Sequence, residues 1–454
     1  MAIPILAFTL IIRNFVGTNN FTWNIRMTTS EFILLNRLSD PRALALQSRR
    51  YPDVDMVYAL NQIQGWQTAR LKLPSWAACD GIVYPPHLNM EQCSSEPAAL
   101  YKQEVARCWI SAVAGAEPES TSMADLTGGF GVDFSFVSRC FGSAVYVERD
   151  SGLCAIVRGN LPRLGLADAS VECAEAEEWL ASAGPHTMFF LDPARRDEHG
   201  AKTVFIGDCT PDVCALLPQL LSKSRFVMLK LSPMLDWHKA VADLQGTVRE
   251  VHIVSVGGEC KELLLVLQSD VCVGAVSNDS DVPHSGSVVR VVCVDIQAKA
   301  DADGVYARSE FAYEWGGESS PCAAAVQDTS GAVPLPCYLY EPNASVMKAG
   351  CFGEIARAFG VSAVSQNSHL FLSRDRVEDF PGRSFTIDGV TTMNRRQLRQ
   401  TLGALRQANV AVRNFPLSAA ELRKRLKLRD GGDVYIFATT AHDGTHVLYL
   451  THKS

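Results

Sequence analysis

A glycine-rich turn between two predicted strands constrains the fold of this chain more than any other feature. Residues 123–133, MADLTGGFGVD, place an acid, a hydroxyl and three glycines between an apolar approach and a helix-like run, 133–141. Seventeen residues past Gly131, the strand-like run 143–148 ends in Glu148. Glycines let a turn approach a ligand closely, and an acid that ends the next strand can bind both ribose hydroxyls. This order predicts a nucleoside-cofactor site in a doubly wound α/β domain.

The residues of this turn discriminate between cofactors. The nicotinamide fingerprint, G-x-G-x-x-G, needs its third glycine for helix packing, but Phe134 occupies that position here. Asp125 ends the preceding strand, where it would repel a pyrophosphate, and no Gly-Lys-Ser/Thr follows as a P-loop would require. S-adenosylmethionine carries no phosphate, and its ammonium group can donate a charge-assisted hydrogen bond to this acid, directly or through water. We therefore expect S-adenosylmethionine as the cofactor.

These residues resemble motif I of the class I S-adenosylmethionine-dependent methyltransferases. More narrowly, the sequence resembles the bacterial methyltransferases that carry a C-terminal THUMP-like domain. The supporting segments, in chain order, are YPPHLNMEQCSSE (84–96), LDPARRD (191–197), KLSPMLDW (230–237), SVGGECKELLLVL (255–267) and AELRKRLKLRDGG (420–432). The resemblance implies a Rossmann-like domain whose mostly parallel sheet ends in an antiparallel hairpin.

The same resemblance implies which residues bind the cofactor. Glu148 is expected to bind the ribose and Glu175 the adenine amine, although a solvated acidic helix start is an equal alternative for Glu175. The remaining implied cofactor residues belong to motif I: Asp125, Thr127, Gly128, Gly129, Phe130 and Gly131.

Composition limits the classes of function. With 454 residues, of which 47% are hydrophobic, two to four globular domains are expected. The net charge of −7 argues against a uniformly basic nucleic-acid binder, so any RNA contact must depend on a local basic patch. Fourteen cysteines occur without a C-x-x-C pair or a zinc-spaced Cys/His quartet, which predicts thiols in a reducing cytoplasm and no metal site.

Four regions follow from the pattern along the chain. Residues 1–112 predict an N-terminal helical region, in which we interpret 1–26 as an apolar leader or a misassigned start, too short to span a bilayer. Residues 113–270 alternate β-rich runs with amphipathic stretches and predict the methyltransferase domain. Residues 271–333 predict a small β-containing module or connector, and 334–454 a THUMP-like, small α/β domain.

Asp192 follows a predicted strand, so it should lie at the sheet edge where open α/β sheets bind ligands. Asp192-Pro193-Ala194-Arg195 resembles the Asp/Asn-Pro-Pro-aromatic motif of amino-methyltransferases acting on bases, in which the acid or amide accepts hydrogen bonds from an exocyclic amine. Ala194 replaces the second proline and Arg195 the aromatic, although arginine can also stack on a base or bind phosphate. We therefore interpret Asp192 and Pro193 as catalytic and Arg195 as substrate-binding. Amine methylation stays open, and a strand-end acid that caps a turn is the alternative.

A comparison with uracil carbon-5 methyltransferases, whose motif reads Asp-Pro-Pro-Arg, concerns the next strand. Those enzymes need a nucleophilic cysteine at its end, but this chain reads Lys230-Leu231-Ser232-Pro233. The absence of cysteine there argues against covalent chemistry of that kind. We interpret Ser232 as a catalytic residue; for Lys230, contact with substrate and burial beside the strands are both open.

The C-terminal region carries ten Lys or Arg residues between Asn394 and Arg429 against one acid, Glu421. Leucines at helical spacing over 398–405 predict one amphipathic helix, and Ser418 with Glu421 predicts a capping box that starts another. A basic face on an acidic protein is typical of binding to an RNA backbone. A solvated helix face is the alternative. The residues that we expect to bind RNA are Arg395, Arg399, Lys424 and Arg425.

Together these features predict a cytoplasmic methyltransferase that acts on a base of ribosomal or transfer RNA. Two alternatives stay open: a methyltransferase for a protein or a small molecule, and a non-catalytic protein that binds S-adenosylmethionine.

Overall fold

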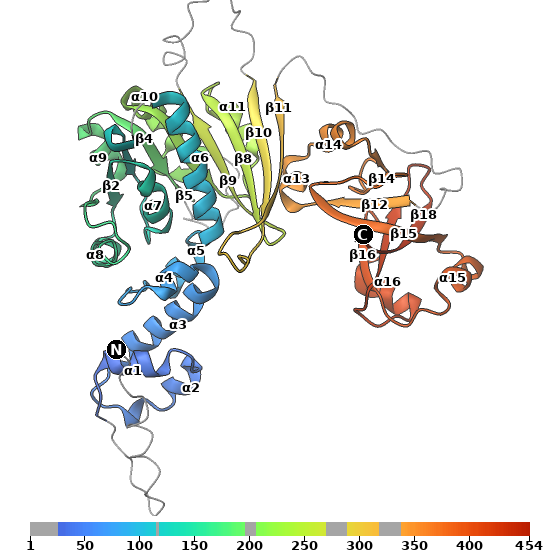
Figure 1. The fold of residues 1–454 in the computed structure, drawn as a ribbon, viewed down its shortest axis with the longest axis horizontal. Coiled ribbons are helices and arrows are strands. Elements are labelled where there is room, and N and C mark those ends of the chain that lie inside the picture. Colours follow the sequence, from blue (N-terminus) through green and yellow to red (C-terminus); the bar gives the residue numbers. More distant parts are fainter. Residues whose placement is uncertain (1–25, 115–117, 196–205, 269–287, 317–336) are drawn as a thin grey trace, which may run out of the picture. The chain divides into compact units, whose positions relative to one another are not determined.

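The computed structural model describes residues 26–114, 118–195, 206–268, 288–316 and 337–454 (Figure 1). The described residues divide into two compact units. One contains the residues up to Cys93 together with Arg158–Gly165, and the other contains Ser94–Val157 and Leu166–Ser454. Among the described residues, no helix is both long enough and apolar enough to cross a membrane.

The second unit is built on a nine-stranded sheet with the order β11-β10-β8-β9-β7-β4-β1-β2-β3. Its strands β7, β4, β1, β2 and β3 are parallel, as expected for a doubly wound domain. The chain runs from β1 outward to β2 and β3 and then returns to β4 on the other side of β1, so β1 and β4 flank the topological switch point where such sheets bind ligands. The parallel strands are β1 (Ser122–Asp125), β2 (Ser143–Glu148), β3 (Ser170–Cys173), β4 (His186–Leu191) and β7 (Ser224–Leu231).

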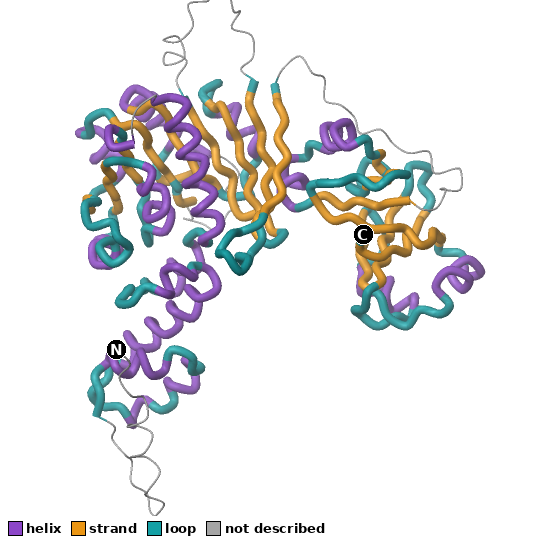
Figure 2. Tube along the Cα trace, viewed as in Figure 1, coloured by secondary structure: helices purple, strands orange, loops and turns teal. Residues whose placement is uncertain are grey.

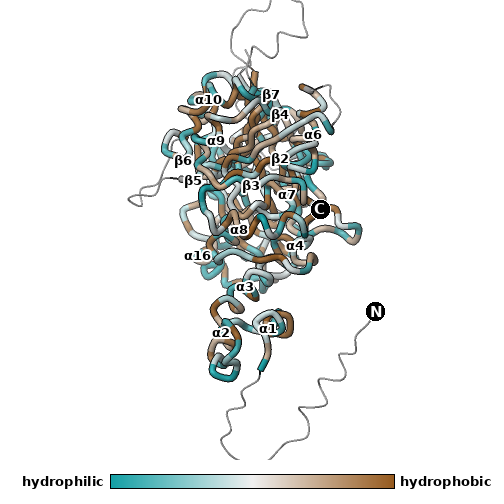
Figure 3. The backbone as a smooth tube through the Cα atoms, turned by 90° about the vertical axis from the view of Figure 1, so that its left-hand side faces the viewer, coloured by the Kyte–Doolittle hydropathy of each residue, from teal (hydrophilic) through white to brown (hydrophobic). Residues whose placement is uncertain are grey.

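Helices connect these strands, and Figure 2 shows the alternation of helix and strand along the tube. β4 and β7 are buried along nearly their whole length, and Figure 3 shows hydrophobic residues concentrated on them. Side chains of α9, α10 and α11 join those of the strands in one hydrophobic core. The connecting helices are α7 (Val132–Val137), α8 (Ser151–Asn160), α9 (Ala176–Ser182), α10 (Val213–Lys223) and α11 (Trp237–Asp243).

Helix α6 (Glu96–Ala114) precedes β1 in the chain and packs against α7, β7 and β8. Although its sequence falls in the region predicted as N-terminal and helical, α6 therefore forms part of the sheet unit.

The expected antiparallel hairpin is formed by β8 (Val248–Val256) and β9 (Glu259–Leu267). Gly257 and Gly258 make its turn with φ angles of 61° and 80°, which favour glycine. The sheet does not end there, because β10 (Val289–Ile296) pairs with β8 and β11 (Arg308–Trp315) pairs with β10. The segment 271–333, which we predicted as a small module or connector, thus contributes its described strands to the main sheet. The physical reason is that β10 is apolar on both faces and must be covered on both.

The first unit is helical. The side chain of Thr28 and the carboxylate of Glu31 form a capping box at the start of α1, and Asp40 caps α2 before Pro41. A small core of Phe32, Leu44, Val54, Ala59 and Ile63 joins the first three of its helices. These helices are α1 (Thr29–Asn36), α2 (Pro41–Ala45), α3 (Met56–Lys72), α4 (Pro74–Ala78) and α5 (His87–Gln92).

The C-terminal residues form a seven-stranded sheet with the order β13-β14-β12-β15-β18-β17-β16, with α13 and α14 preceding β13. α13 packs against β8 and β10 of the main sheet. The elements are β12 (Cys337–Pro342), α13 (Ala344–Ala349), α14 (Phe352–Phe359), β13 (Ser362–Ala363), β14 (Phe371–Ser373), β15 (Gly382–Thr392), α15 (Arg395–Leu402), β16 (Asn409–Arg413), α16 (Ala419–Leu426), β17 (Val434–Thr440) and β18 (His446–Lys453).

Candidate functional site

The glycine-rich turn lies directly after β1, and each of its glycines has a specific structural reason. Gly129 and Gly131 have φ angles of 55° and 81°, in the left-handed region that favours glycine. A Cβ on Gly128 would lie 2.1 Å from the ring of Tyr146 on β2, so a side chain does not fit there. The backbone amide of Gly131 donates to the Gly128 carbonyl at 2.8 Å and closes the turn.

Glu148 ends β2 and reaches across to this turn. Its Oε2 accepts a hydrogen bond from the backbone amide of Gly129 at 2.9 Å, and its Oε1 accepts one from the backbone amide of Asp150 at 2.9 Å. Because β1 and β2 are parallel neighbours, both strand ends meet at one sheet edge. The turn and the acid expected to bind the ribose are therefore adjacent, with the Glu148 side chain half-buried.

Asp125, the last residue of β1, is buried beneath the turn. Its Oδ1 accepts a hydrogen bond from the backbone amide of Thr127 at 3.0 Å. Burial raises the pKa of Asp125 well above its usual value, and the nearby carboxylates of Asp133, Asp192 and Glu148 raise it further. The Thr127 amide favours the charged form but does not outweigh these effects.

The remaining two residues that we expect at the cofactor, Phe130 and Glu175, differ in their burial and in their distance from the turn along the sheet edge. Phe130 belongs to the turn itself and is buried. Glu175 is exposed and directly precedes α9, beyond the end of β3. No hydrogen bond or ion pair joins the Glu175 side chain to the glycine-rich turn in the described parts of the chain.

Asp192 lies directly after β4, beside the end of β1. Its backbone amide donates to the Thr127 hydroxyl at 2.6 Å, and its Oδ2 accepts from the Lys230 ammonium at 2.5 Å. The side chain is 39% exposed, so the carboxylate remains accessible from solvent. Pro193 is buried, and Ala194–Arg195 forms the short strand β5, which pairs with β6 (Cys209–Thr210). The Arg195 side chain lies outside the part of the chain that the structure describes.

Lys230 is the penultimate residue of β7, and the structure makes it the partner of Asp192. Leu229 pairs with Leu191 across β7 and β4, which brings the two side chains to one edge. Ser232 follows two residues later, in a turn where its Oγ accepts from the Met234 amide at 3.3 Å. Ser232 thus lies near the same strand end, although its hydroxyl has no hydrogen bond to Asp192.

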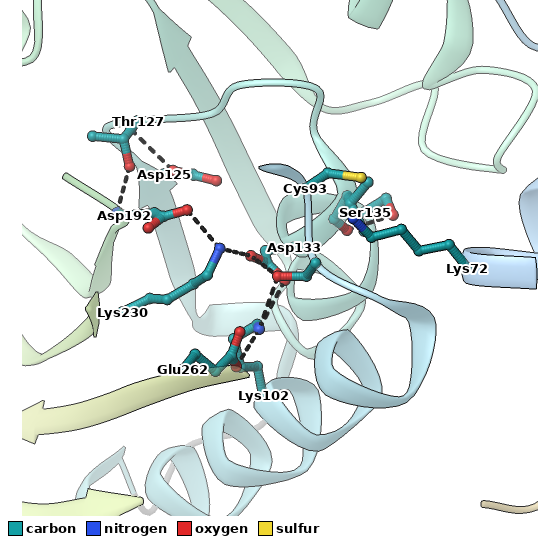
Figure 4. Close-up of polar contacts among 12 residues, drawn as sticks. Lys72, Cys93, Lys102, Asp125, Thr127, Asp133, Ser135, Asp192, Lys230 and Glu262 are labelled. Atoms are coloured by element: carbon teal, nitrogen blue, oxygen red, sulfur yellow. Dashed lines mark hydrogen bonds and ion pairs between the residues drawn. The ribbon is translucent and has the colours of Figure 1, made fainter. Parts of the chain in front are cut away.

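A buried ion network continues from Lys230 into the protein (Figure 4). The Lys230 ammonium lies 3.4 Å from Oδ2 of Asp133, in the first turn of α7. Asp133 lies 3.1 Å from the ammonium of Lys102 on α6, which in turn contacts Glu262 on β9 at 2.5 Å. Ser94 donates to Asp133 at 2.8 Å and accepts from Lys102 at 3.1 Å.

The network shifts the pKa values of its members in opposite directions. Burial disfavours the Lys230 ammonium, but the Asp192 and Asp133 carboxylates outweigh burial and hold its pKa well above the usual value. Burial would raise the pKa of Asp133, but Lys102 and Lys230 lower it. For Glu262, burial dominates and raises the pKa despite Lys102.

Sequence reasoning assigned no role to Lys102, Asp133 or Glu262. For Glu262 only a weak signal exists, because it directly precedes the apolar run 263–267 but follows the charged residues Glu259 and Lys261 of the same strand. A charged residue in a buried strand usually has a buried partner. Lys102 carries no comparable signal, since a lysine on an amphipathic helix normally faces solvent.

The basic residues of the C-terminal region lie mainly on α15 and α16, with Asn394 and Ser418 as N-caps. The apolar sides of both helices pack into the same core cluster, so their charged sides face outward. Not all ten cations are available, because Arg413 pairs with Glu341 and Arg423 pairs with Asp430. The four residues expected to bind RNA, Arg395, Arg399, Lys424 and Arg425, are exposed and form no ion pair with any described residue.

Comparison with protein families identifies two adjoining domains at the C-terminus. Residues 338–381 match a ferredoxin-like domain, and residues 382–453 match a THUMP-like domain. No match was found among curated proteins.

Solved structures extend the comparison to the whole chain. A candidate methyltransferase from Porphyromonas gingivalis W83 is 28% identical, with a TM-score of 0.74 over 95% of this chain and 100% of that one. An rRNA methylase from Streptococcus thermophilus is 12% identical, with a TM-score of 0.28 over 37% of this chain and 95% of that one. An O-methyltransferase from Bacillus cereus, solved with S-adenosylhomocysteine, is 11% identical, with a TM-score of 0.30 over 44% of this chain and 100% of that one.

Proposed function

We propose that this chain, which is a methyltransferase carrying a C-terminal THUMP-like domain, transfers a methyl group from S-adenosylmethionine to a base of ribosomal or transfer RNA. The observation that carries the proposal is the meeting of three features at one sheet edge. These are the glycine-rich turn, the ribose-type acid Glu148 and the accessible carboxylate of Asp192. They lie at the switch point of a doubly wound sheet, where a cofactor and a reacting group must come together.

The residues of the turn fit S-adenosylmethionine. Apart from the two adjoining residues, no heavy atom of the described part of the chain lies closer than 3.8 Å to the position of a Cβ on Gly129, so the turn leaves room for a ligand. Glu148 is suited to bind the ribose hydroxyls, Asp125 the ammonium and Glu175 the adenine amine. When bound, the cofactor supplies an electrophilic methyl group on a positively charged sulfur.

Asp192 is suited to orient the nucleophile. A carboxylate accepts hydrogen bonds only, so it can hold an N–H or O–H group and favour the departure of its proton. Pro193 and Ser232 would shape the same corner, and Arg195 would contact the target nucleotide. Positioning of this kind, rather than covalent chemistry, is the main contribution that methyl transfer needs from a protein.

The THUMP-like domain supports RNA as the substrate. Its exposed cations on α15 and α16 give a chain of net charge −7 a local basic surface, which suits a phosphate backbone. Contacts from basic side chains to phosphates carry no sequence information, so base selection would come from the corner near Asp192.

Four measurements test this function. Mass spectrometry of nucleosides from a strain lacking the gene should reveal a missing methylated base, and the purified protein should restore it with labelled S-adenosylmethionine. The Asp192→Ala variant should lose turnover while its affinity for S-adenosylhomocysteine stays within a few-fold. Label that enters protein or a small molecule, but not RNA, would overturn the RNA assignment. If calorimetry detects no binding of S-adenosylmethionine, the cofactor assignment is wrong.

A further inference from the structure

The contacts around Lys230 form a closed ring that begins and ends in the glycine-rich turn. The Thr127 hydroxyl, in the turn, accepts a hydrogen bond from the backbone amide of Asp192. The Asp192 carboxylate in turn accepts a hydrogen bond from the Lys230 ammonium. Lys230 contacts Asp133, which lies two residues beyond Gly131 at the start of α7. Backbone and side chain of Asp192 are therefore both tied to the segment that forms the candidate cofactor site (Figure 4).

The ring leaves one side of the Asp192 carboxylate for a ligand. Oδ2 is taken by Lys230, whereas Oδ1 has no hydrogen-bond partner among the described residues. The backbone amide is also satisfied, by Thr127, so the residue has little freedom to turn. A carboxylate held in this way presents a single oxygen in a defined direction.

Lys230 needs support to hold this position, because a lysine side chain has four rotatable bonds and a buried ammonium is costly when unpaired. Asp133 supplies a second carboxylate, and Lys102 with Glu262 completes the buried cluster. Lys102, Lys230, Asp133, Glu262 and Asp192 together contain two ammonium groups and three carboxyl groups. Asp192 is the most exposed of the carboxyl groups, with 39% of its side chain accessible against 10% for Asp133 and 3% for Glu262.

We propose that Lys230 is a positioning residue for Asp192, and that Lys102 supports it through Asp133. This inference rests on the proposed function and deepens it. The site presents one fixed carboxylate oxygen to a nucleophile that carries hydrogen, such as an amine or a hydroxyl. A group without hydrogen gains nothing from that oxygen.

Replacing Lys230 separates positioning from binding. In Lys230→Met the Asp192 carboxylate loses its partner and turns away, and a displacement of about 1 Å at a reacting group can lower turnover about 100-fold. We expect kcat for bulk RNA from the deletion strain to fall by that order, while KM and S-adenosylhomocysteine affinity stay within about 3-fold. Lys230→Arg should recover part of kcat. Lys239→Met is the matched control, because Lys239 forms a similar pair with Asp243 on the surface of α11.

Three outcomes overturn the positioning role. The first is a folded Lys230→Met protein with kcat close to wild type. The second is an equal loss of turnover and S-adenosylhomocysteine affinity. The third is a crystal structure of Lys230→Met in which the Asp192 side chain keeps its place.

If Lys230→Met does not fold, Lys230→Met/Asp133→Asn removes one charge of each sign and is expected to be folded and inactive. Wild-type kcat in that double variant contradicts the proposal.

The crystal structure also separates this inference from the proposed function. If wild-type protein transfers no methyl group to RNA, the function fails. The orientation of Asp192 in Lys230→Met then still decides whether Lys230 positions it.

Discussion

The hydroxyl of Thr127 accepts a hydrogen bond of 2.6 Å from the backbone amide of Asp192. The two residues follow β1 and β4, which are parallel neighbours in the sheet. Thr127 belongs to the glycine-rich turn after β1, and Asp192 begins the segment after β4. The Thr127 side chain thus links the turn proposed to bind the cofactor to the acid proposed to orient the nucleophile. A substitution that removes this hydrogen bond should therefore affect both cofactor binding and catalysis.

Thr127→Val should impair cofactor binding and turnover together. Valine has nearly the shape of threonine but no acceptor, so the Asp192 amide loses its partner at a cost of about 1–3 kcal/mol. Calorimetry with S-adenosylhomocysteine and initial rates with RNA measure the two effects. Thr127→Ser, which keeps the hydroxyl, is the control and should resemble wild type. A Thr127→Val protein with wild-type turnover would show that the hydrogen bond between Thr127 and Asp192 is dispensable.

Glu148→Ala should weaken cofactor binding by about 1–3 kcal/mol, because two ribose hydroxyls lose a charged acceptor. The variant also leaves the amide of Gly129 without its present partner, which loosens the turn. Calorimetry with S-adenosylhomocysteine gives the affinity, and adenine alone serves as the comparison because it lacks the ribose. Equal weakening of both ligands would argue against ribose recognition by Glu148.

Cofactor affinity should fall as the pH is lowered through the raised pKa of Asp125. Burial raises that pKa in the cofactor-free protein, and an ammonium group nearby favours the ionised carboxylate. Binding therefore lowers the pKa and releases a proton, so affinity increases with pH until Asp125 is ionised before binding. Calorimetry in two buffers with different protonation enthalpies counts the protons. Asp125→Asn should bind more weakly and lose this proton release; release that persists in the variant would exclude Asp125.

Reversing Arg395, Arg399, Lys424 and Arg425 to glutamate should reduce RNA affinity and flatten its dependence on salt. Fewer cations on α15 and α16 release fewer counterions from the RNA backbone. S-adenosylhomocysteine affinity should hardly change, which makes it the internal control. Arg413 and Arg423 are left intact because they already form ion pairs, Arg413 with the buried Glu341 and Arg423 with Asp430. Wild-type RNA affinity of the quadruple variant at low salt would identify this face as a solvated surface only.

Acid should weaken the contact between α6 and the sheet through Glu250 on β8. Burial would raise the pKa of Glu250, but hydrogen bonds from His252, Trp109 and Arg290 lower it from 4.5 to about 2. A depressed folded-state pKa stabilises the protein above the unfolded value, and this contribution is lost as the pH falls from 4.5 through about 2. The difference in unfolding free energy between wild type and Glu250→Gln should shrink over that range. A difference that is independent of pH would contradict this account.

The sequence by itself determined the features that depend on local chemistry. Glycines at 129 and 131 are required by positive φ angles, and β2 and β4 end at Glu148 and Leu191 because their apolar runs end there. The order of these runs predicted a doubly wound parallel sheet followed by an antiparallel hairpin, and the structure confirms both, but β10 and β11 extend the sheet beyond the hairpin, so the hairpin is not terminal. Leucine spacing and the Ser418 capping box likewise predicted α15 and α16.

Only the tertiary structure decided which charges meet. Lys102 finds Glu262 at a separation of 160 residues and Lys230 finds Asp133 at 97, distances over which a sequence pattern carries no information about pairing. The same holds for Arg413, whose pairing with Glu341 removes it from the basic face, and for β10, whose place beside β8 follows from burial on both faces. Local patterns report what a segment can form, whereas the partner of a buried charge depends on how distant segments pack.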